Sequence, residues 1–270
     1  MTEELTTEAF MDMIEKRYNK KYLSYSSIKN ALGDMRLFDM YMKGEVKKTS
    51  DALTFGSLYD MMLFEPDRAK SHYVILNDNA ILDQMSEKAR SGKNPKATNE
   101  WKRLFSEYKA KVEDNGQEIV LVDDWTKAQE MIDRLYASGL YDSYLNGGQF
   151  QVEFNDDIDG IRVRGFYDCL GDKIVVDSKS TRSMQKFRYD VGSFCYDIQA
   201  YIYMKVSGAE DFYWLVQEKA YPFYPGIVRC TEETLFSGEM KFNEAIGRIA
   251  TFLELGPDYD YDKDYAEFSV

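Results

Sequence analysis

Cysteine and histidine are scarce, with three cysteines and one histidine among 270 residues. Cys169, Cys195 and Cys230 are odd in number and far apart, which predicts no disulfide framework, zinc finger or cluster-binding site. His72 has no acidic or cysteine partner at motif spacing, so a packed or surface residue is favoured over a metal ligand or proton shuttle. Long apolar runs and a signal-peptide pattern are also missing. These absences predict a cytoplasmic protein with no membrane partner.

Positive charge is in short supply as well. The 34 lysines and arginines face 47 acidic residues, which gives a formal net charge of −13. This excess argues against a protein that coats nucleic acid by bulk attraction, because phosphate binders carry a basic footprint. It leaves room for a DNA enzyme whose acidic exterior surrounds a basic channel.

The most basic segment runs from Glu87 to Lys111, and Gly92 and Pro95 interrupt any helix in its first half. One interpretation is a loop that grips the DNA backbone through Lys93 and Lys96. The more ordinary interpretation is a solvated loop followed by a helix whose apolar stripe faces inward.

A short buried strand carries the most informative residues. Ile174–Val176 are consecutive β-branched apolar residues that follow the turn signal Gly171-Asp172. The turn predicts a hairpin with the preceding run, Gly160 to Leu170, which brings Asp168 beside Asp177. The period of two in a strand places Asp177 and Lys179 on one face.

Two adjacent carboxylates repel each other unless a cation lies between them. Hard oxygen ligands on a rigid support suit Mg²⁺, or Mn²⁺ as its close substitute. Lys179 next to such a metal is a point charge for a phosphate oxygen, or a base if its pKa is lowered. The constellation suits phosphodiester hydrolysis, although an Asp-x-Lys triplet at a strand end also arises by chance.

Asp168, Asp177-Ser178-Lys179 and Gln199-Ala200-Tyr201-Ile202-Tyr203 resemble, in order and spacing, the nuclease core of the PD-(D/E)xK superfamily. The branch they resemble is the RecE (exonuclease VIII) type of phage nuclease, kin to the RecB nuclease domain and lambda exonuclease. Further similar stretches are Leu23 to Lys29, Ala52 to Tyr59, Leu63 to Pro66, Val152 to Phe154 and Gln217 to Pro222.

The resemblance implies a role for each matching residue. Asp168 and Asp177 would bind the metal with the Ser178 carbonyl, while Lys179 would position or activate water. Gln199 and Tyr203, four apart on one helix face, would support them, although a packed aromatic helix is the alternative.

Two further positions have more than one interpretation. Glu153 would be a further acidic ligand or would orient Lys179, and an exposed strand residue is the alternative. Tyr59 stands where RecE-like relatives have a metal-binding histidine, and a phenol is a poor Mg²⁺ ligand.

A basic run, Arg182, Lys186 and Arg188, follows the triplet and suits contact with the scissile DNA strand, or else a solvated surface. Together the patterns predict an α/β, restriction-endonuclease-like fold: a mixed, mainly antiparallel sheet flanked by helices, with a helical N-terminal half. We expect residues 1–147 to pack on a core at 148–256, followed by an acidic tail at 257–270.

The resemblance implies a metal-dependent exonuclease that degrades linear double-stranded DNA in the 5′-to-3′ direction. It also implies a single-strand annealing protein as partner, in phage recombination, and a homo-oligomeric ring. The alternative is a DNA-end-binding protein that keeps the fold with weak or no turnover.

Overall fold

The structure, a computed structural model, describes residues 6–46 and 51–261, with only the backbone of residues 51–54. The chain forms two compact units, one from Met1–Ser50 with Leu135–Val270 and the other from Asp51–Arg134. The predicted boundary at residue 147 stays a prediction, as does the acidic tail, of which residues 262–270 lie outside the described residues.

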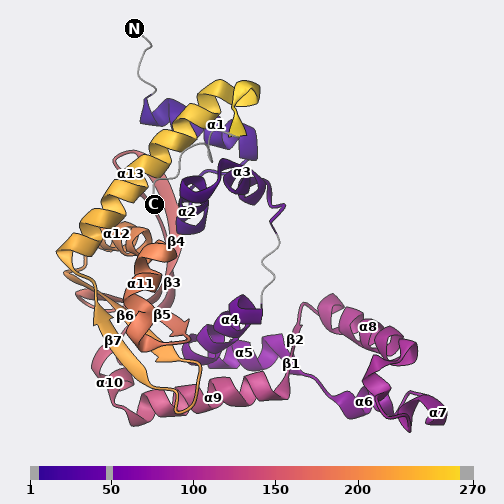
Figure 1. Cartoon of the computed structure of the whole chain (residues 1–270). Helices are drawn as coiled ribbons and strands as arrows, with labels where there is room; N and C mark the ends of the chain where they lie inside the picture. The colour runs from indigo at the N-terminus through magenta and orange to yellow at the C-terminus, as the bar shows by residue number, and fades with distance from the viewer. Residues whose placement is uncertain (1–5, 47–50, 262–270) are drawn as a thin grey trace. The chain divides into compact units, whose positions relative to one another are not determined.

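A five-stranded sheet forms the centre of the first unit (Figure 1). Its strands, in spatial order, are β3 (Gln149–Ile158), β4 (Ile161–Leu170), β5 (Ile174–Thr181), β6 (Asp211–Glu218) and β7 (Pro225–Arg229). Only the β5–β6 pair is parallel, and the other neighbours are antiparallel. A parallel pair needs a crossover connection, which two helices supply here. The predicted fold class, mixed and mainly antiparallel, is confirmed.

The middle strand, β5, is buried as its sequence predicts. Val175 and Val176 are fully buried between the neighbouring strands. The backbone N–H of Gly171 donates to the carbonyl of Ile174 at 2.9 Å and closes the predicted hairpin with β4. The buried part of β5 therefore fixes the positions of the polar residues at its C-terminal end.

Helices surround this sheet. They are α1 (Thr7–Tyr18), α2 (Tyr25–Gly33), α3 (Met35–Lys43), α10 (Leu140–Tyr144), α11 (Phe187–Ser193), α12 (Tyr196–Ser207) and α13 (Glu232–Leu255), with 3₁₀ turns at Met184–Lys186 and Gly256–Asp258. Helix α12 packs on the sheet and α13 packs on α12. The close approach needs Gly238, because a Cβ there would lie 2.1 Å from the carbonyl oxygen of Asp197. A common apolar core joins these layers.

Two stretches whose apolar spacing is continuous are divided into separate helices. The stripe from Ile28 to Met42 is interrupted at Asp34, which is extended and caps α3 by accepting from the N–H of Arg36 at 2.8 Å. The stretch from Val191 to Val206 breaks at Cys195, whose φ of 57° is left-handed. Apolar spacing continues across both breaks, so periodicity alone does not reveal them.

The last strand, β7, is short. It begins at Pro225, and residues 219–224 form a loop after β6. Because proline has no backbone N–H and phenylalanine at 223 has a φ of 58°, this stretch cannot continue a ladder.

The start of α2 is anchored on β4 by backbone pairing. Leu23 donates to the carbonyl of Arg162 at 2.9 Å and accepts from the N–H of Arg164 at 2.8 Å. Ser24 then caps α2 in a reciprocal capping box with Ser27. This pairing fixes Tyr25, the first residue of α2.

The second unit is mainly helical. It contains α4 (Asp51–Phe64), α5 (Pro66–His72), β1 (Tyr73–Ile75), α6 (Asp78–Leu82), α7 (Glu87–Arg90), a 3₁₀ turn at Pro95–Ala97, α8 (Asn99–Asp114), β2 (Glu118–Val120) and most of α9 (Val122–Ala137). Strands β1 and β2 pair in parallel. Ile81, Met85, Trp101 and Leu104 form a small core of their own.

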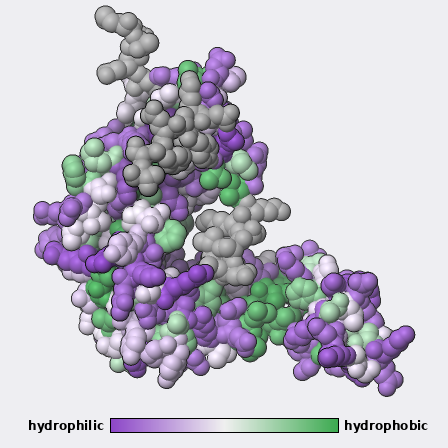
Figure 2. Space-filling model, in the orientation of Figure 1, coloured by the Kyte–Doolittle hydropathy of each residue, from purple (hydrophilic) through white to green (hydrophobic). Residues whose placement is uncertain are grey.

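The surface is consistent with the composition. Hydrophilic residues dominate the visible face in Figure 2, with apolar ones scattered among them. Among the described residues, no helix combines the length and the apolar character that crossing a membrane requires.

Candidate active site

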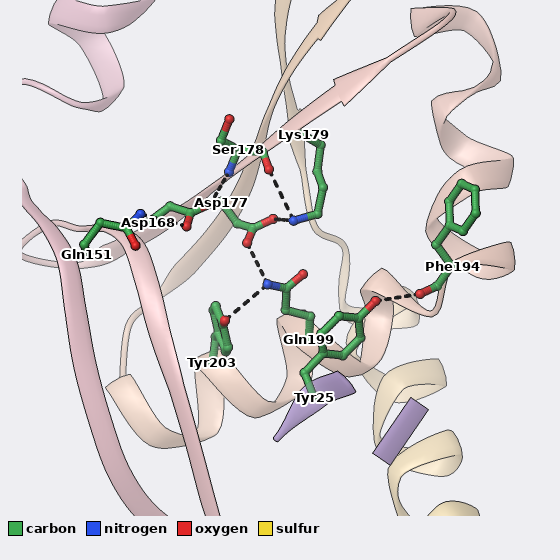
Figure 3. A network of polar contacts seen from close by, with 9 residues as sticks. All are labelled: Tyr25, Gln151, Asp168, Asp177, Ser178, Lys179, Phe194, Gln199 and Tyr203. Carbon is green, nitrogen blue, oxygen red and sulfur yellow. Dashed lines mark hydrogen bonds and ion pairs between the residues drawn. The ribbon is translucent and has the colours of Figure 1, made fainter. Parts of the chain in front are cut away.

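The carboxylates predicted to be adjacent meet where β4 and β5 separate. The last paired residues are Cys169 and Val176, so Asp168 and Asp177 are the next residue of each strand. The N–H of Ser178 donates to Asp168 Oδ2 at 2.8 Å. Figure 3 shows both carboxylates and Lys179 converging on this point. The hairpin therefore brings the predicted acids together.

Lys179 lies against Asp177. Its Nζ forms an ion pair with Asp177 Oδ2 and donates to the carbonyl of Ser178 at 3.2 Å. The ring of Tyr196, the first residue of α12, lies with its centroid 4.9 Å from the same Nζ. The lysine side chain is 16% exposed, so its charge is largely shielded from bulk water.

Helix α12 supplies the other contact to Asp177. Gln199 Nε2 donates to Asp177 Oδ1 at 2.7 Å and to the Tyr203 hydroxyl at 3.2 Å. Both α12 residues are buried, and their spacing of four places them on one face as predicted. The helix thereby holds the Asp177 carboxylate in one orientation.

Burial and charge shift the acid–base properties of the group. Burial raises the pKa of Asp177 to about 7; the charge of Asp168 adds to the rise and Lys179 opposes it. Burial also raises the pKa of Asp168. For Lys179, burial alone would lower the pKa, but Asp177 and Asp168 outweigh it and raise the pKa. Lys179 is therefore an ammonium in this arrangement and not a general base.

Gln151 is a site residue that the sequence did not reveal. Its Nε2 donates to Asp168 Oδ1 at 3.2 Å from β3. Its φ of 50° is left-handed, a conformation that costs a non-glycine residue about 1–3 kcal/mol. Nothing in a glutamine within a strand pattern predicts this backbone, so no local signal could have found it.

Tyr25 is the second residue that sequence reasoning missed. Its hydroxyl donates to the carbonyl of Phe194 at 2.6 Å, as Figure 3 shows. Burial raises its pKa, and the nearby Lys179 partly counters that rise. The stretch Leu23 to Lys29, which carries the family resemblance, was the available signal.

Glu153 has different surroundings. Its carboxylate is 41% exposed and pairs with Arg164 on β4, 2.7 Å from the guanidinium Nε, whereas the ion-pair partner of Lys179 is Asp177. Of the roles considered for Glu153, an exposed strand residue matches this environment.

The predicted DNA-binding cations lie on exposed segments. Arg182 and Lys186 follow β5 and form no ion pair within the described part of the chain, while Arg188 donates to the Tyr189 hydroxyl at 2.7 Å. In the second unit Lys93 is exposed, and Lys96 pairs with Asp78 and lies over the Trp101 ring. Their role in DNA binding stays a prediction.

Two side chains of the second unit were considered in relation to metal binding from the sequence. Tyr59 is 1% exposed on α4, and burial raises its pKa, so its phenol stays protonated. His72 is partly buried and lies 3.6 Å from Glu118 across the β1–β2 edge, as expected for a packed surface residue.

The donor set at the strand ends fits a hard divalent cation. Two carboxylates and a backbone carbonyl converge there, and Gln199 Oε1 is a buried oxygen without a hydrogen-bond donor among the described residues. Oxygen ligands of this kind suit Mg²⁺ or Mn²⁺. Among the side chains that the structure describes, no three His, Cys, Asp or Glu residues are grouped as they would be around a metal ion.

Solved structures of other proteins resemble this chain to different degrees. The crystal structure of the "putative exonuclease" from Eubacterium rectale superposes with a TM-score of 0.61 at 19% identity, covering 95% of this chain and 88% of that chain. At this identity the likeness establishes the fold alone. The structure of SSO0001 reaches a TM-score of 0.30 at 16% identity over 66% of this chain and 85% of that one, and no conclusion rests on it. No curated protein matches the sequence.

A family model gives the decisive match. The model described as "PDDEXK-like domain of unknown function (DUF3799)" matches residues 24–255, which include both strands, the acids, the lysine and helix α12. The matched segment covers most of the chain. The protein therefore belongs to this PDDEXK-like family and, with it, to the PD-(D/E)xK nuclease superfamily.

Proposed function

We propose that this protein is a metal-dependent deoxyribonuclease that degrades linear double-stranded DNA from its ends. The observation that carries the proposal is the convergence of Asp168, Asp177 and Lys179 at the end of a buried strand, braced by Gln199. The resemblance to RecE-type nucleases supports 5′-to-3′ polarity, a role in phage-type recombination and a single-strand annealing protein as partner.

The metal would be held by Asp168, Asp177 and the Ser178 carbonyl. A bound divalent cation lowers the pKa of water and neutralises charge on the phosphate. Lys179, already an ammonium, would stabilise the negative charge that develops on the phosphate oxygens. Gln199 holds Asp177 in position, and Tyr203 in turn accepts from the Gln199 amide.

The test is degradation of DNA by the purified protein. Linear duplex labelled at the 5′ or 3′ end and closed circular duplex are incubated with Mg²⁺ or with EDTA. The proposal is supported if the wild type degrades the linear duplex but not the circular one, and does so with Mg²⁺ but not with EDTA. Lys179→Ala should then fail to degrade the linear duplex. Degradation that persists in EDTA, or that is equal in Lys179→Ala, contradicts it.

A second candidate function is a DNA-end-binding protein without turnover. The buried, protonated Tyr59 favours it, because RecE-like relatives have a metal-binding histidine at this position. Tight binding to linear ends with no cleavage in either Mg²⁺ or Mn²⁺ would establish this alternative.

Gln151 provides a prediction about metal affinity. Because its amide orients Asp168, Gln151→Ala should weaken Mn²⁺ binding by about 10- to 100-fold, the usual cost of losing such a supporting contact. Isothermal titration with Mn²⁺ measures this. Gln149→Ala, an exposed glutamine on the same strand, is the matched control. Equal affinities in the two variants would exclude the role.

Lys93 and Lys96 provide a prediction about DNA binding. If both contact phosphates, Lys93→Gln with Lys96→Gln should reduce the steepness of log K against log salt by about 2, since each contact contributes about 0.9. Fluorescence anisotropy at several salt concentrations measures the slope. Lys16→Gln with Lys21→Gln removes the same charge from two exposed positions, one in the last turn of α1 and one just after that helix. If the slopes of the two double variants are equal, the segment that carries Lys93 and Lys96 is solvated surface and does not contact DNA.

A further inference from the structure

The β6–β7 connection presents aromatic side chains to solvent. We name residues 219–224 the aromatic hairpin loop. Tyr221 is 86% exposed and Tyr224 is 53% exposed. The ring of Phe223 lies edge-on to that of Tyr221, with centroids 5.9 Å apart. Single exposed aromatic residues are ordinary, but here two exposed tyrosines lie three positions apart, and a half-buried phenylalanine between them contacts one of the two rings.

The loop is built to hold one shape. Gln217, fully buried, donates from Nε2 to the carbonyl of Phe223 at 2.9 Å. The N–H of Phe223 donates to the carbonyl of Ala220 at 2.8 Å, and that of Glu218 to the carbonyl of Tyr224 at 3.0 Å. A φ of 58° is unfavourable for phenylalanine, so these bonds hold the residue in a conformation it rarely adopts. The backbone that carries the rings is therefore held in one conformation before anything binds.

The aromatic hairpin loop begins beside the end of β5 that carries Lys179. The N–H of Lys219 donates to the carbonyl of Thr181 at 2.8 Å, and Thr181 is two residues beyond Lys179 on β5. At about 3.3 Å per strand residue, this start lies within roughly 10 Å of the Lys179 backbone. Figure 1 shows β5, β6 and β7 as adjacent strands of the sheet.

Cations accompany the rings. The segment after Thr181 is tied to the hairpin because the N–H of Met184 donates to Glu218 Oε1 at 2.7 Å. The same segment carries Arg182 and Lys186, both exposed and outside every ion pair of the described residues. In a chain with a net charge of −13, unpaired cations beside exposed aromatic rings are the footprint of a single-stranded nucleic-acid surface.

We propose that the aromatic hairpin loop binds the unpaired bases of a single-stranded DNA tail next to the duplex end at the active site. This inference rests on the proposed function. Tyr221 stacks on a base, with Phe223 supporting its ring, while Arg182 and Lys186 contact the phosphates. Stacking accepts every base, so the surface is sequence-tolerant.

The experiment compares binding of two DNA probes in EDTA. One is a blunt duplex, and the other is the same duplex with a ten-nucleotide single-stranded tail carrying 2-aminopurine. Tyr221→Ala should bind the tailed duplex about fivefold to tenfold more weakly, from the usual contribution of one stacked base. Its binding to the blunt duplex should stay within about twofold. Tyr221→Phe keeps the ring and should bind as the wild type does.

Phe236→Ala, which removes a 61% exposed ring from α13, is the matched control. Quenching of 2-aminopurine by the wild-type protein and its loss in Tyr221→Ala support stacking. Equal weakening on both probes, or no weakening on either, overturns the proposal. A change in oligomeric state by light scattering with unchanged DNA binding also overturns it, because the loop is then an interface between copies. Cleavage of blunt linear duplex by the wild type, measured separately, shows whether the proposed function itself fails.

Discussion

Lys179→Ala should reduce the rate of DNA cleavage by about a hundredfold to a thousandfold, the usual effect of removing one donor that stabilises transition-state charge. The lysine is well placed for this because Asp177 and Asp168 keep it protonated at the end of β5. Single-turnover cleavage with saturating enzyme measures the chemical step without the contribution of binding. DNA affinity in EDTA should change far less than the rate.

The same substitution should also destabilise the metal-free fold. It leaves the Asp177 carboxylate, 2% exposed, without its cation, and breaking a buried pair in this way costs about 3–5 kcal/mol. A divalent cation should restore part of that loss, because it replaces the missing positive charge. Thermal melts with and without Mn²⁺ therefore distinguish a folded, inactive variant from an unfolded one.

Lys179→Arg and Lys173→Ala complete this experiment. Arginine keeps the charge but not the compact geometry of an ammonium, so it should recover stability better than rate. Lys173 lies one residue before β5, is exposed and pairs with Glu210. Because surface ion pairs contribute little, Lys173→Ala should keep the cleavage rate within about twofold of the wild-type rate. If Lys179→Ala folds and keeps more than a tenth of the wild-type cleavage rate, Lys179 does not stabilise the transition state of the cleavage step.

Much of the site could be predicted because its signals are local. Three β-branched residues before Asp177 identify the buried strand, and Gly171 marks the turn that sets its register with β4. Register determines which residues face each other, so the meeting of Asp168 with Asp177 follows from the turn. The spacing of four between Gln199 and Tyr203 likewise fixes a shared helix face.

The missing parts depend on long-range contacts or on unusual backbone conformations. Tyr25 reaches the carbonyl of Phe194 across 169 residues of sequence, a pairing that no spacing rule contains. Gln151 and Cys195 adopt left-handed φ values that their residue types disfavour, and tertiary packing holds them there. Residue propensities are therefore least able to predict the strained backbone conformations at the site.

The metal-free protein should lose thermal stability as the pH rises from about 4 to about 7, and Asp177→Asn should weaken this pH dependence while abolishing metal-dependent cleavage. Burial raises the pKa of Asp177 to about 7, above the usual 3.8 that we take for the unfolded chain. The folded state then binds more protons than the unfolded state between about pH 4 and pH 7, so stability falls as pH rises through this window. Asparagine does not ionise, and its oxygen can still accept from Gln199, but Lys179 loses its ion-pair partner. In EDTA the melting temperature of the variant should therefore change less between pH 4 and pH 7 than that of the wild type.

Metal should distinguish the two proteins further. A cation at a hundred times its dissociation constant stabilises the wild-type fold by about 2.7 kcal/mol. That corresponds to roughly 5–10 °C for a protein of this size. The variant lacks a carboxylate for the ion, so at pH 8 Mn²⁺ should raise the melting temperature of the wild type and change that of the variant little. Asp172→Asn, in the exposed turn before β5, should behave as the wild type in both buffers. A wild-type melting temperature that ignores Mn²⁺, or an equal gain in Asp177→Asn, would mean that this carboxylate does not hold the metal, and that its burial serves the fold alone.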